Sequence, residues 1–166
     1  FRERRAALIT TLSPALPYAL FDRSVSHATE LSQYNGKIVF DGIIDCAKKC
    51  LENGIPVGLG TDTGCPFITH YDMWRELVYF QRYCGVSNRF ALYTATRRNA
   101  EIAHIDGITG TLAAGKCADL IVTEQNPLDD LCALRHVSMV MTRGTLLRNP
   151  KIKKYKAVEA ELDKFL

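Results

Sequence analysis

The sequence has no long apolar run, no internal repeat and little net charge, and each absence excludes a class of protein. No stretch approaches the roughly 20 apolar residues of a membrane span, so we expect no membrane partner. The formal net charge is +3, from 21 basic and 18 acidic residues, which is too small to indicate a nucleic-acid partner. The one dense basic stretch, residues 151–156, is followed by acidic residues and is interpreted as a solvated tail helix rather than a phosphate-binding patch.

Signals for export and for disulfide bonding are also missing. Residues 1–5 are charged and lack the apolar segment of a signal peptide, and the first residue is not Met, which suggests a fragment or a processed product. The six cysteines have no regular spacing, and we expect reduced thiols in a cytoplasmic protein. Cys46 and Cys50 could share a metal on one helix face, but the sequence offers no second ligand pair at suitable spacing, so ordinary thiols are favoured.

The first half of the chain has the pattern of a parallel α/β unit. Residues 6–11 and 55–60 are short apolar runs, typical of strands buried on both faces. Residues 40–53 between them predict a helix, with Asp41 as a cap and Gly54 as the stop. A strand, a helix and a strand in this order indicate a right-handed parallel crossover.

The second half changes from helices to short strands. Helices are predicted over residues 71–84, from Ser87 to about Thr94, and from a cap at Thr96 to residue 103. Beyond residue 104, closely spaced glycine turns separate short strand-like runs, and Arg143-Gly144 predicts a hairpin turn. The predicted strands are residues 110–113, 120–123, 137–142 and 145–147, with a helical turn at 126–130 and an amphipathic helix or tail at 151–165.

An acidic residue directly after a buried parallel strand is the most informative feature. Asp62 lies in Gly-Leu-Gly-Thr-Asp-Thr-Gly, residues 58–64, where the glycines let the backbone turn sharply or let a ligand approach. Functional groups of parallel α/β folds gather at the carboxyl ends of the strands. A carboxylate there could bind a divalent metal or transfer a proton, but it could equally cap the turn or the next helix.

Three stretches occur in a characteristic order and spacing. They are residues 54–62, residues 95–101 (Ala-Thr-Arg-Arg-Asn-Ala-Glu) and residues 107–122. Asn126-Pro127-Leu128 and the hairpin at 140–147 complete the pattern, which covers most of residues 6–147. The pattern resembles the C-terminal part of the amidohydrolase superfamily, in its imidazolonepropionase and dipeptidase-like group. Residues 54–62 resemble the eighth barrel strand with its terminal aspartate, residues 95–101 the helix after the barrel, and residues 107–122 the return into a small β-sandwich.

The resemblance implies an α/β fold with part of a TIM (β/α)8 barrel, namely its last two strands and their helices. The C-terminal half of a small composite β-sandwich would follow. The implied domains are residues 1–104 for the barrel part, 105–148 for the sandwich part and 149–166 for a tail helix. Such a barrel takes about 250 residues, so this chain is too short to close one.

The resemblance also implies a catalytic role for Asp62. In the family, one or two divalent metal ions, commonly zinc, lie at the barrel mouth, and the last-strand aspartate binds metal and shuttles a proton. The implied reaction is hydrolysis of a C–N bond, in a cyclic amide or peptide-like small molecule, by metal-activated water. The family's His-x-His pair and later ligands belong to earlier strands that this sequence lacks, so the chain alone is expected to bind metal poorly and to be inactive without its N-terminal barrel part.

Other candidate site residues are Tyr18 and His70, which are predicted substrate contacts. Tyr18 follows the first strand on the loop face expected for Asp62, while His70 could equally be a surface or capping residue. His27 and His104 are predicted to be plain helix residues, His136 to precede a strand, and Asp119 to be a turn residue remote from the site.

A non-catalytic alternative stays open. The chain could be a β-rich remnant or a split half that needs its N-terminal partner, because two unclosed parallel strands expose edges and apolar faces that favour self-association into a homo-oligomer. A small binding protein that stands alone is a third possibility.

Overall fold

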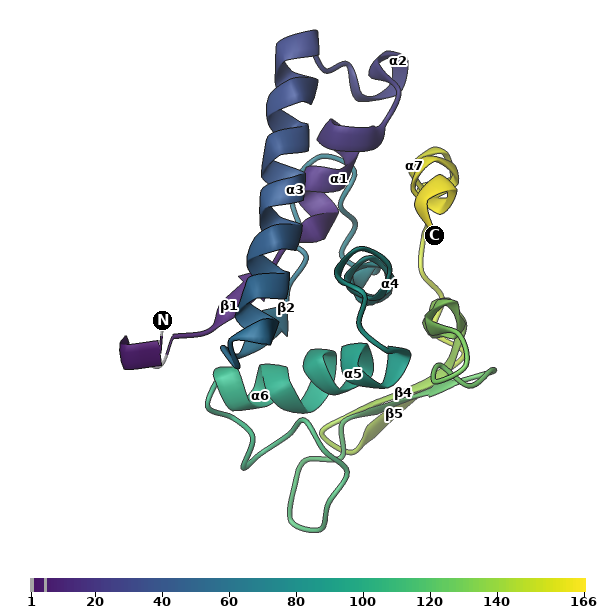
Figure 1. The fold of residues 1–166 in the computed structure, drawn as a ribbon. Coiled ribbons are helices and arrows are strands. Elements are labelled where there is room, and N and C mark those ends of the chain that lie inside the picture. The colour runs from purple at the N-terminus through teal and green to yellow at the C-terminus, as the bar shows by residue number, and fades with distance from the viewer. Residues whose placement is uncertain (1, 5) are drawn as a thin grey trace.

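The fold begins with a parallel strand pair joined by helices. The computed structural model describes residues 2–4 and 6–166. After a short 3-10 turn, η1 (Arg2–Arg4), β1 (Leu8–Thr10) pairs in parallel with β2 (Val57–Leu59), with Leu8 opposite Val57 and Thr10 opposite Leu59 (Figure 1). The predicted strand–helix–strand crossover is therefore confirmed.

Three helices connect these strands: α1 (Leu12–Leu20), α2 (Arg23–Ser26) and α3 (Glu30–Glu52). The prediction that α3 begins near residue 40 with Asp41 as its cap is wrong. The helix begins ten residues earlier, where the Thr29 side chain accepts a hydrogen bond from the backbone N–H of Ser32. Asp41 instead pairs with Lys37 on the exposed face, at 2.7 Å.

Packing against α1 explains why the polar first half of α3 is helical. A Cβ atom placed on Gly36 would lie 2.9 Å from the Cβ atom of Tyr18, so glycine is what lets the two helices approach closely. This tertiary contact has no counterpart in the local sequence pattern.

The second group of helices is α4 (Met73–Cys84), α5 (Asn88–Tyr93), a π-helical turn η2 (Thr94–Arg98) and α6 (Asn99–Ile102). Gly85 ends α4 with φ +75. The predicted start of the next helix at Ser87 is confirmed, because the Ser87 side chain caps α5 by accepting a hydrogen bond from the N–H of Phe90. The predicted cap at Thr96 is wrong, because α5, η2 and α6 run on continuously. The Thr96 hydroxyl donates back to the Leu92 carbonyl at 2.7 Å, an alternative open to threonine inside a helix.

The C-terminal third contains an antiparallel sheet in the order β3 (Leu120–Thr123), β4 (Val137–Thr142), β5 (Thr145–Arg148). The hairpin turn at Arg143 and Gly144 is confirmed, because both residues have positive φ, +47 and +81, as a type I′ turn requires. The predicted strand at 110–113 is absent: Gly110 and Thr111 form a bend, and residues 112 and 113 have no regular secondary structure. The predicted helical turn at 126–130 is a turn that leads into a 3-10 helix, η3 (Leu131–Arg135).

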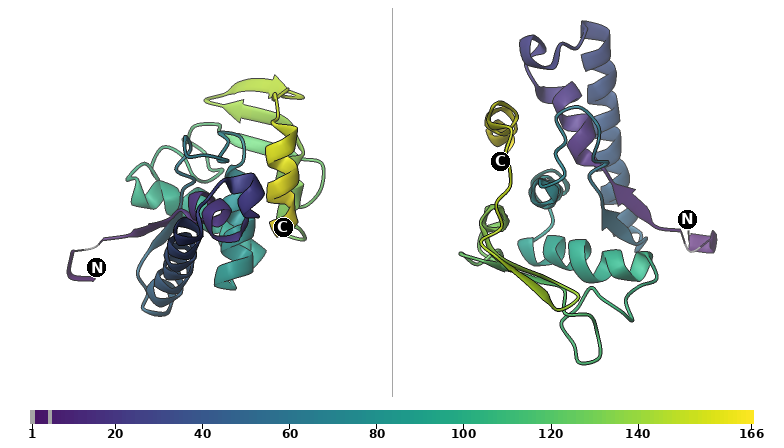
Figure 2. Two further views of the ribbon diagram at one scale, coloured as in Figure 1. Left: turned by 90° about the horizontal axis from the view of Figure 1, so that it is seen from above. Right: turned by 180° about the vertical axis from the view of Figure 1, so that it is seen from behind.

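The end of the chain differs most from expectation. Residues 151–155 are not helical, and the helix that follows, α7 (Lys156–Leu162), continues into η4 (Asp163–Phe165). The basic stretch 151–156 is exposed, as predicted, but its predicted helix is absent over residues 151–155. The segment beyond it is docked, since Leu162 is 2% exposed and Glu159 is buried. In Figure 1, and from behind in the right-hand view of Figure 2, α4 lies between α3 and α7. The tail is held by ion pairs that no local periodicity reveals.

The core lies where α1, α3 and α4 meet, and it is built mainly from their apolar side chains. Its completely buried members include Leu12, Leu16, Ala47 and Phe80. The parallel sheet, by contrast, is covered incompletely: the Ile9 side chain of β1 is 44% exposed. An open, largely apolar groove of about 1080 Å³ lies beside it, where β1, α6, β3 and β4 approach one another.

Two negative findings apply to the described part of the chain. None of its helices combines the length and the apolar character that crossing a membrane requires. Its six cysteines are all free thiols, as predicted.

We expect Gly58→Ala to destabilise the fold. Its Cβ atom would lie 2.6 Å from Oδ1 of Asn99 and 2.7 Å from Cδ1 of Ile9, and overpacking of this kind costs about 1–3 kcal/mol. The measurement is the free energy of unfolding in urea. Gly42→Ala is the matched control: nothing lies within 4 Å of its Cβ position in α3, so alanine should stabilise by about 0.5–1 kcal/mol. Equal effects at the two positions would contradict the packing described for β2.

Candidate functional site

The candidate site is the carboxyl end of β2, where the chain leaves the parallel sheet. Asp62 is exposed and has φ +49, an uncommon backbone conformation for a residue other than glycine. Its carboxylate Oδ2 accepts a hydrogen bond from Sγ of Cys65 at 3.4 Å, and this contact raises the pKa of the Cys65 thiol.

The hydrogen bonds of Asp62 do not favour the alternative that this residue caps the turn or the next helix. Among the described residues, no backbone N–H donates to its carboxylate, and the cap position of the following helix belongs to Asp72. The Asp62 carboxylate therefore keeps most of its acceptor capacity free for another group.

Asn99 holds the last residue of β2 in place through its side-chain amide. Its Nδ2 donates to the Leu59 carbonyl and its Oδ1 accepts from the Leu59 N–H, both at 2.9 Å. The side-chain amide thus takes the place of a neighbouring strand on the side of β2 that faces away from β1. Asn99 belongs to the stretch 95–101 that resembles the family, but the sequence alone did not single it out.

We expect Asn99→Ala to cost about 1–3 kcal/mol of stability, because it leaves a strand N–H and a C=O without partners. Urea unfolding measures the effect. Asn35→Ala, on the exposed surface of α3, is the control and should change stability by no more than about 0.5 kcal/mol. A loss for Asn99→Ala as small as that of the control would show that Asn99 does not hold β2.

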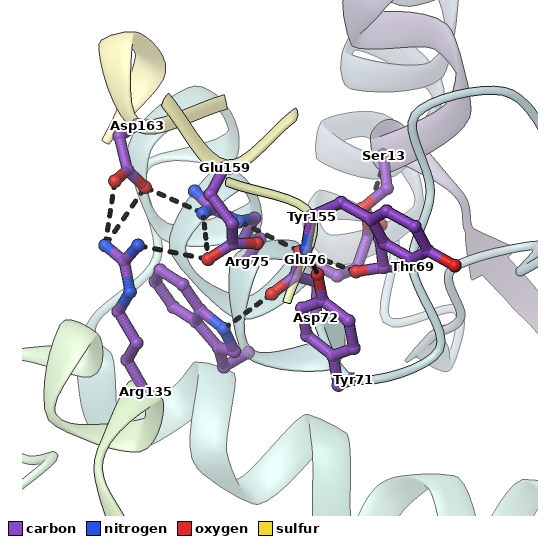
Figure 3. A network of polar contacts seen from close by, with 11 residues as sticks. Ser13, Thr69, Tyr71, Asp72, Arg75, Glu76, Arg135, Tyr155, Glu159 and Asp163 are labelled. Carbon is purple, nitrogen blue, oxygen red and sulfur yellow. Dashed lines mark hydrogen bonds and ion pairs between the residues drawn. The ribbon is translucent and has the colours of Figure 1, made fainter. Parts of the chain in front are cut away.

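Glu76 binds the chain where β1 ends and α1 begins, a role that the sequence did not reveal. This α4 residue is fully buried, and its carboxylate accepts hydrogen bonds from the N–H groups of Leu12 and Ser13, the first two residues of α1, at 2.9 and 2.8 Å. Figure 3 shows Glu76 beside Ser13. The hydroxyls of Ser13 and Thr10 donate to it as well, at 2.6 and 3.2 Å. Burial raises the pKa of Glu76, and these hydrogen bonds oppose that shift.

A second polar cluster ends the loop that carries Asp62. Asp72 accepts hydrogen bonds from the Thr69 hydroxyl at 2.7 Å and from Nε1 of Trp74 at 3.0 Å. Arg75, which is 1% exposed, lies beside it and pairs with Glu159 and Asp163 in the C-terminal segment (Figure 3). The sequence did not predict that Arg75 and Glu76 are buried, because charged residues on the exposed face of a helix occur at the same spacing.

The two predicted substrate contacts, Tyr18 and His70, lie on different elements. Tyr18 is half-buried on α1 and packs against Gly36 of α3, at the edge of a shallow groove between the two helices. His70 is exposed in the turn before α4, with its ring 5.4 Å from that of Tyr71. Among the described residues, no hydrogen bond or ion pair joins either side chain to Asp62, so their roles stay predictions.

The other histidines and Asp119 have structural positions. The prediction that His27 and His104 are helix residues is wrong. Both lie just past the end of a helix and have positive φ, +54 and +57. His136 directly precedes β4, as predicted. Asp119 accepts from the Thr109 hydroxyl and the Arg143 N–H, which fits the predicted turn role and lowers the pKa of its carboxyl.

Over residues 2–4 and 6–166, no three His, Cys, Asp or Glu side chains gather closely enough to hold a metal ion. Asp62, with its exposed carboxylate, fits the role of one ligand, and the described residues do not supply a complete site.

Comparison with known proteins places the chain in a family. The profile of the Amidohydrolase family matches residues 21–147. A candidate prolidase from Bifidobacterium longum is 42% identical over 96% of this chain, with a TM-score of 0.92. A Xaa-Pro dipeptidase with bound methionine in its active site is 28% identical over 89% of the chain (TM-score 0.77), and a prolidase in complex with N-methylphosphonate-L-proline is 26% identical over 90% (TM-score 0.75).

The chain is much shorter than these relatives. It spans 39%, 36% and 36% of their respective lengths. No curated protein sequence matches it significantly. The match to the family profile covers most of the chain and includes β2, Asp62 and Asn99, and on this ground the chain belongs to the amidohydrolase family.

Proposed function

We propose that this chain is the C-terminal part of a metal-dependent amidohydrolase that hydrolyses the C–N bond of a dipeptide with a C-terminal proline. The observation that carries the proposal is Asp62, exposed with a largely free carboxylate directly after a buried parallel strand. The likeness to a candidate prolidase and to a Xaa-Pro dipeptidase supports the substrate class.

In this proposal β1 and β2 are the last two strands of a (β/α)8 barrel. Residues 1–104 contribute the barrel part, 105–148 contribute half of a composite β-sandwich that includes β3, β4 and β5, and 149–166 form the tail. The exposed side of the parallel pair, with Ile9 at its surface, is where the earlier barrel strands pack.

Asp62 performs two tasks in this proposal. Its carboxylate is one ligand of a divalent metal, most commonly zinc in this family, and it takes the proton of the attacking water and passes it to the leaving nitrogen. A divalent metal at such a site supplies Lewis-acid polarisation of the carbonyl and lowers the pKa of water. Tyr18 and His70 are proposed to contact the substrate.

The remaining ligands come from the N-terminal part of the protein. A catalytic zinc site uses about three protein ligands, and this chain contributes a single carboxylate. We therefore expect the 166 residues alone to bind zinc weakly and to hydrolyse no dipeptide. Tight zinc binding in calorimetry, together with dipeptide hydrolysis by the isolated chain, would contradict this assignment.

The second candidate function is a non-catalytic, self-associating unit. It is favoured by the groove of about 1080 Å³ and by apolar side chains exposed around it, such as Ile9 and Leu112, which are 44% and 74% exposed. Gel filtration of the isolated chain tests this candidate function, since a single monomer peak at high concentration would count against self-association.

A chimera tests the proposed function directly. This chain replaces the matching C-terminal 39% of the Bifidobacterium longum relative, and the chimera is assayed with Xaa-Pro dipeptides and added zinc. We expect hydrolysis that a metal chelator abolishes. A folded, metal-loaded chimera that cleaves none of these dipeptides would overturn the proposal.

A further inference from the structure

The loop that carries Asp62 has little structure of its own. This Asp62 loop, residues 61–72, lies between β2 and α4 and contains neither a helix nor a named strand. Its internal backbone hydrogen bonds are three turn contacts: Cys65 to Asp62, Ile68 to Cys65, and Asp72 to Thr69, at 3.4, 3.1 and 3.2 Å. A loop with so few internal bonds depends on outside contacts for a defined position.

The C-terminal latch, which we define as residues 155–166, supplies such contacts at three points. The first is aromatic. Phe67 of the loop packs edge-on against Phe21, with ring centroids 5.2 Å apart, and Phe165 of the latch stacks on the same Phe21 ring at 5.6 Å. Phe21 is 1% exposed and the other two rings are half-buried, so an aromatic cluster around Phe21 joins loop and latch.

The second contact is a hydrogen bond from the backbone of the latch. The N–H of Tyr155 donates to the hydroxyl of Tyr71 at 2.9 Å, just before α7 begins (Figure 3). This bond holds the end of the Asp62 loop against the start of the latch.

The third contact is an ion-pair network. Asp72 holds Thr69 of the loop and pairs with Nε of Arg75 at 3.4 Å. Nη2 of Arg75 then reaches Asp163 at 2.7 Å and Glu159 at 3.3 Å in the latch.

A second guanidinium completes the network. Arg135 of η3 pairs with Glu159 at 3.0 Å and with Asp163 at 2.9 Å. The ring of Trp74 contacts both guanidinium groups, with its centroid 4.5 Å from Arg75 and 5.6 Å from Arg135. Loss of Asp163 would remove the shortest ion pair of Arg75 and leave Asp72 and Glu159 as its partners. A buried charge is costly unless it is well paired, so each member of the network constrains the others.

We propose that the C-terminal latch positions the Asp62 loop, with Asp163 as the main positioning residue. The assignment of Asp62 as catalytic rests on the proposed function, but the contacts between the Asp62 loop and the C-terminal latch do not. The loop is ordered because three of its residues are tied to the last twelve residues of the chain. Tyr71 is tied directly, Phe67 through Phe21, and Thr69 through Asp72 and Arg75.

Hydrogen exchange of the 166-residue chain tests this link without metal or substrate. In Asp163→Asn, amides of residues 66–72 should exchange about tenfold faster, while α3 exchanges at the wild-type rate. Asp163→Glu, which keeps the charge, should restore most of the protection. Asp41→Asn, which breaks an exposed ion pair in α3, is the control and should leave the loop unchanged.

Two outcomes would overturn the proposal. One is unchanged exchange in residues 66–72 of Asp163→Asn; the other is an equal rise in the loop and in α3, which would show a global rather than a positioning role. Tyr71→Phe is a second, milder variant, because it removes only the acceptor of the Tyr155 N–H. It should speed exchange in the same segment by a smaller factor, and no effect there would count against the second contact.

Discussion

Asp62→Asn is expected to lower kcat of the chimera by about 10²- to 10⁴-fold, the range that a positioned proton-transfer group contributes. Asparagine keeps the size of the side chain but accepts no proton and carries no charge for a metal. Because Asp62 is exposed and its carboxylate contacts only Cys65 among the described residues, the substitution should leave the stability of the chain almost unchanged. Steady-state kinetics with a Xaa-Pro dipeptide, together with metal content, measure the effect.

Asp41→Asn is the matched control for charge removal, since its ion pair with Lys37 lies on the exposed face of α3. It should retain full activity, because exposed pairs contribute at most about 1 kcal/mol to stability. If Asp62→Asn kept more than a tenth of the wild-type kcat with normal metal content, Asp62 would not be the proton shuttle.

Glu76→Ala is expected to destabilise the chain by about 3–5 kcal/mol. It leaves the buried N–H groups of Leu12 and Ser13, and the Ser13 hydroxyl, without their acceptor. Urea unfolding followed by circular dichroism gives the free energy. The loss should be smaller for Glu76→Gln, whose amide oxygen still accepts hydrogen bonds.

The control for this prediction is Glu52→Ala, at the exposed end of α3. It should change stability by no more than about 0.5 kcal/mol. A loss below about 1 kcal/mol for Glu76→Ala would mean that α1 is held at the end of β1 by other groups, which would contradict the geometry described for this carboxylate.

Local patterns predicted those parts of the fold that local chemistry decides. The parallel strands at 8–10 and 57–59 follow from short apolar runs. The Arg143-Gly144 turn follows from the ease with which glycine adopts the positive φ that a tight hairpin turn requires. The first half of α3 could not be predicted, because its helical state depends on α1 approaching at Gly36. The docked tail depends on two arginines distant in sequence, Arg75 and Arg135.

The candidate site was predictable only in part. Asp62 was found because its position after a buried strand is itself a local signal. Glu76 and Arg75 were missed, because a charged residue in a helix is normally exposed and only tertiary packing reveals its burial. Tyr18 and His70 were chosen for their place in the chain, and in the structure their side chains contact Gly36 and Tyr71.

The most direct test of the central claim is anomalous X-ray diffraction from zinc-loaded crystals of the chimera. The account predicts an anomalous peak about 2.0–2.2 Å from a carboxylate oxygen of Asp62, with the remaining ligands from the N-terminal part. A well-ordered zinc site that does not include Asp62, or an ordered Asp62 with no metal beside it in an active chimera, would contradict it.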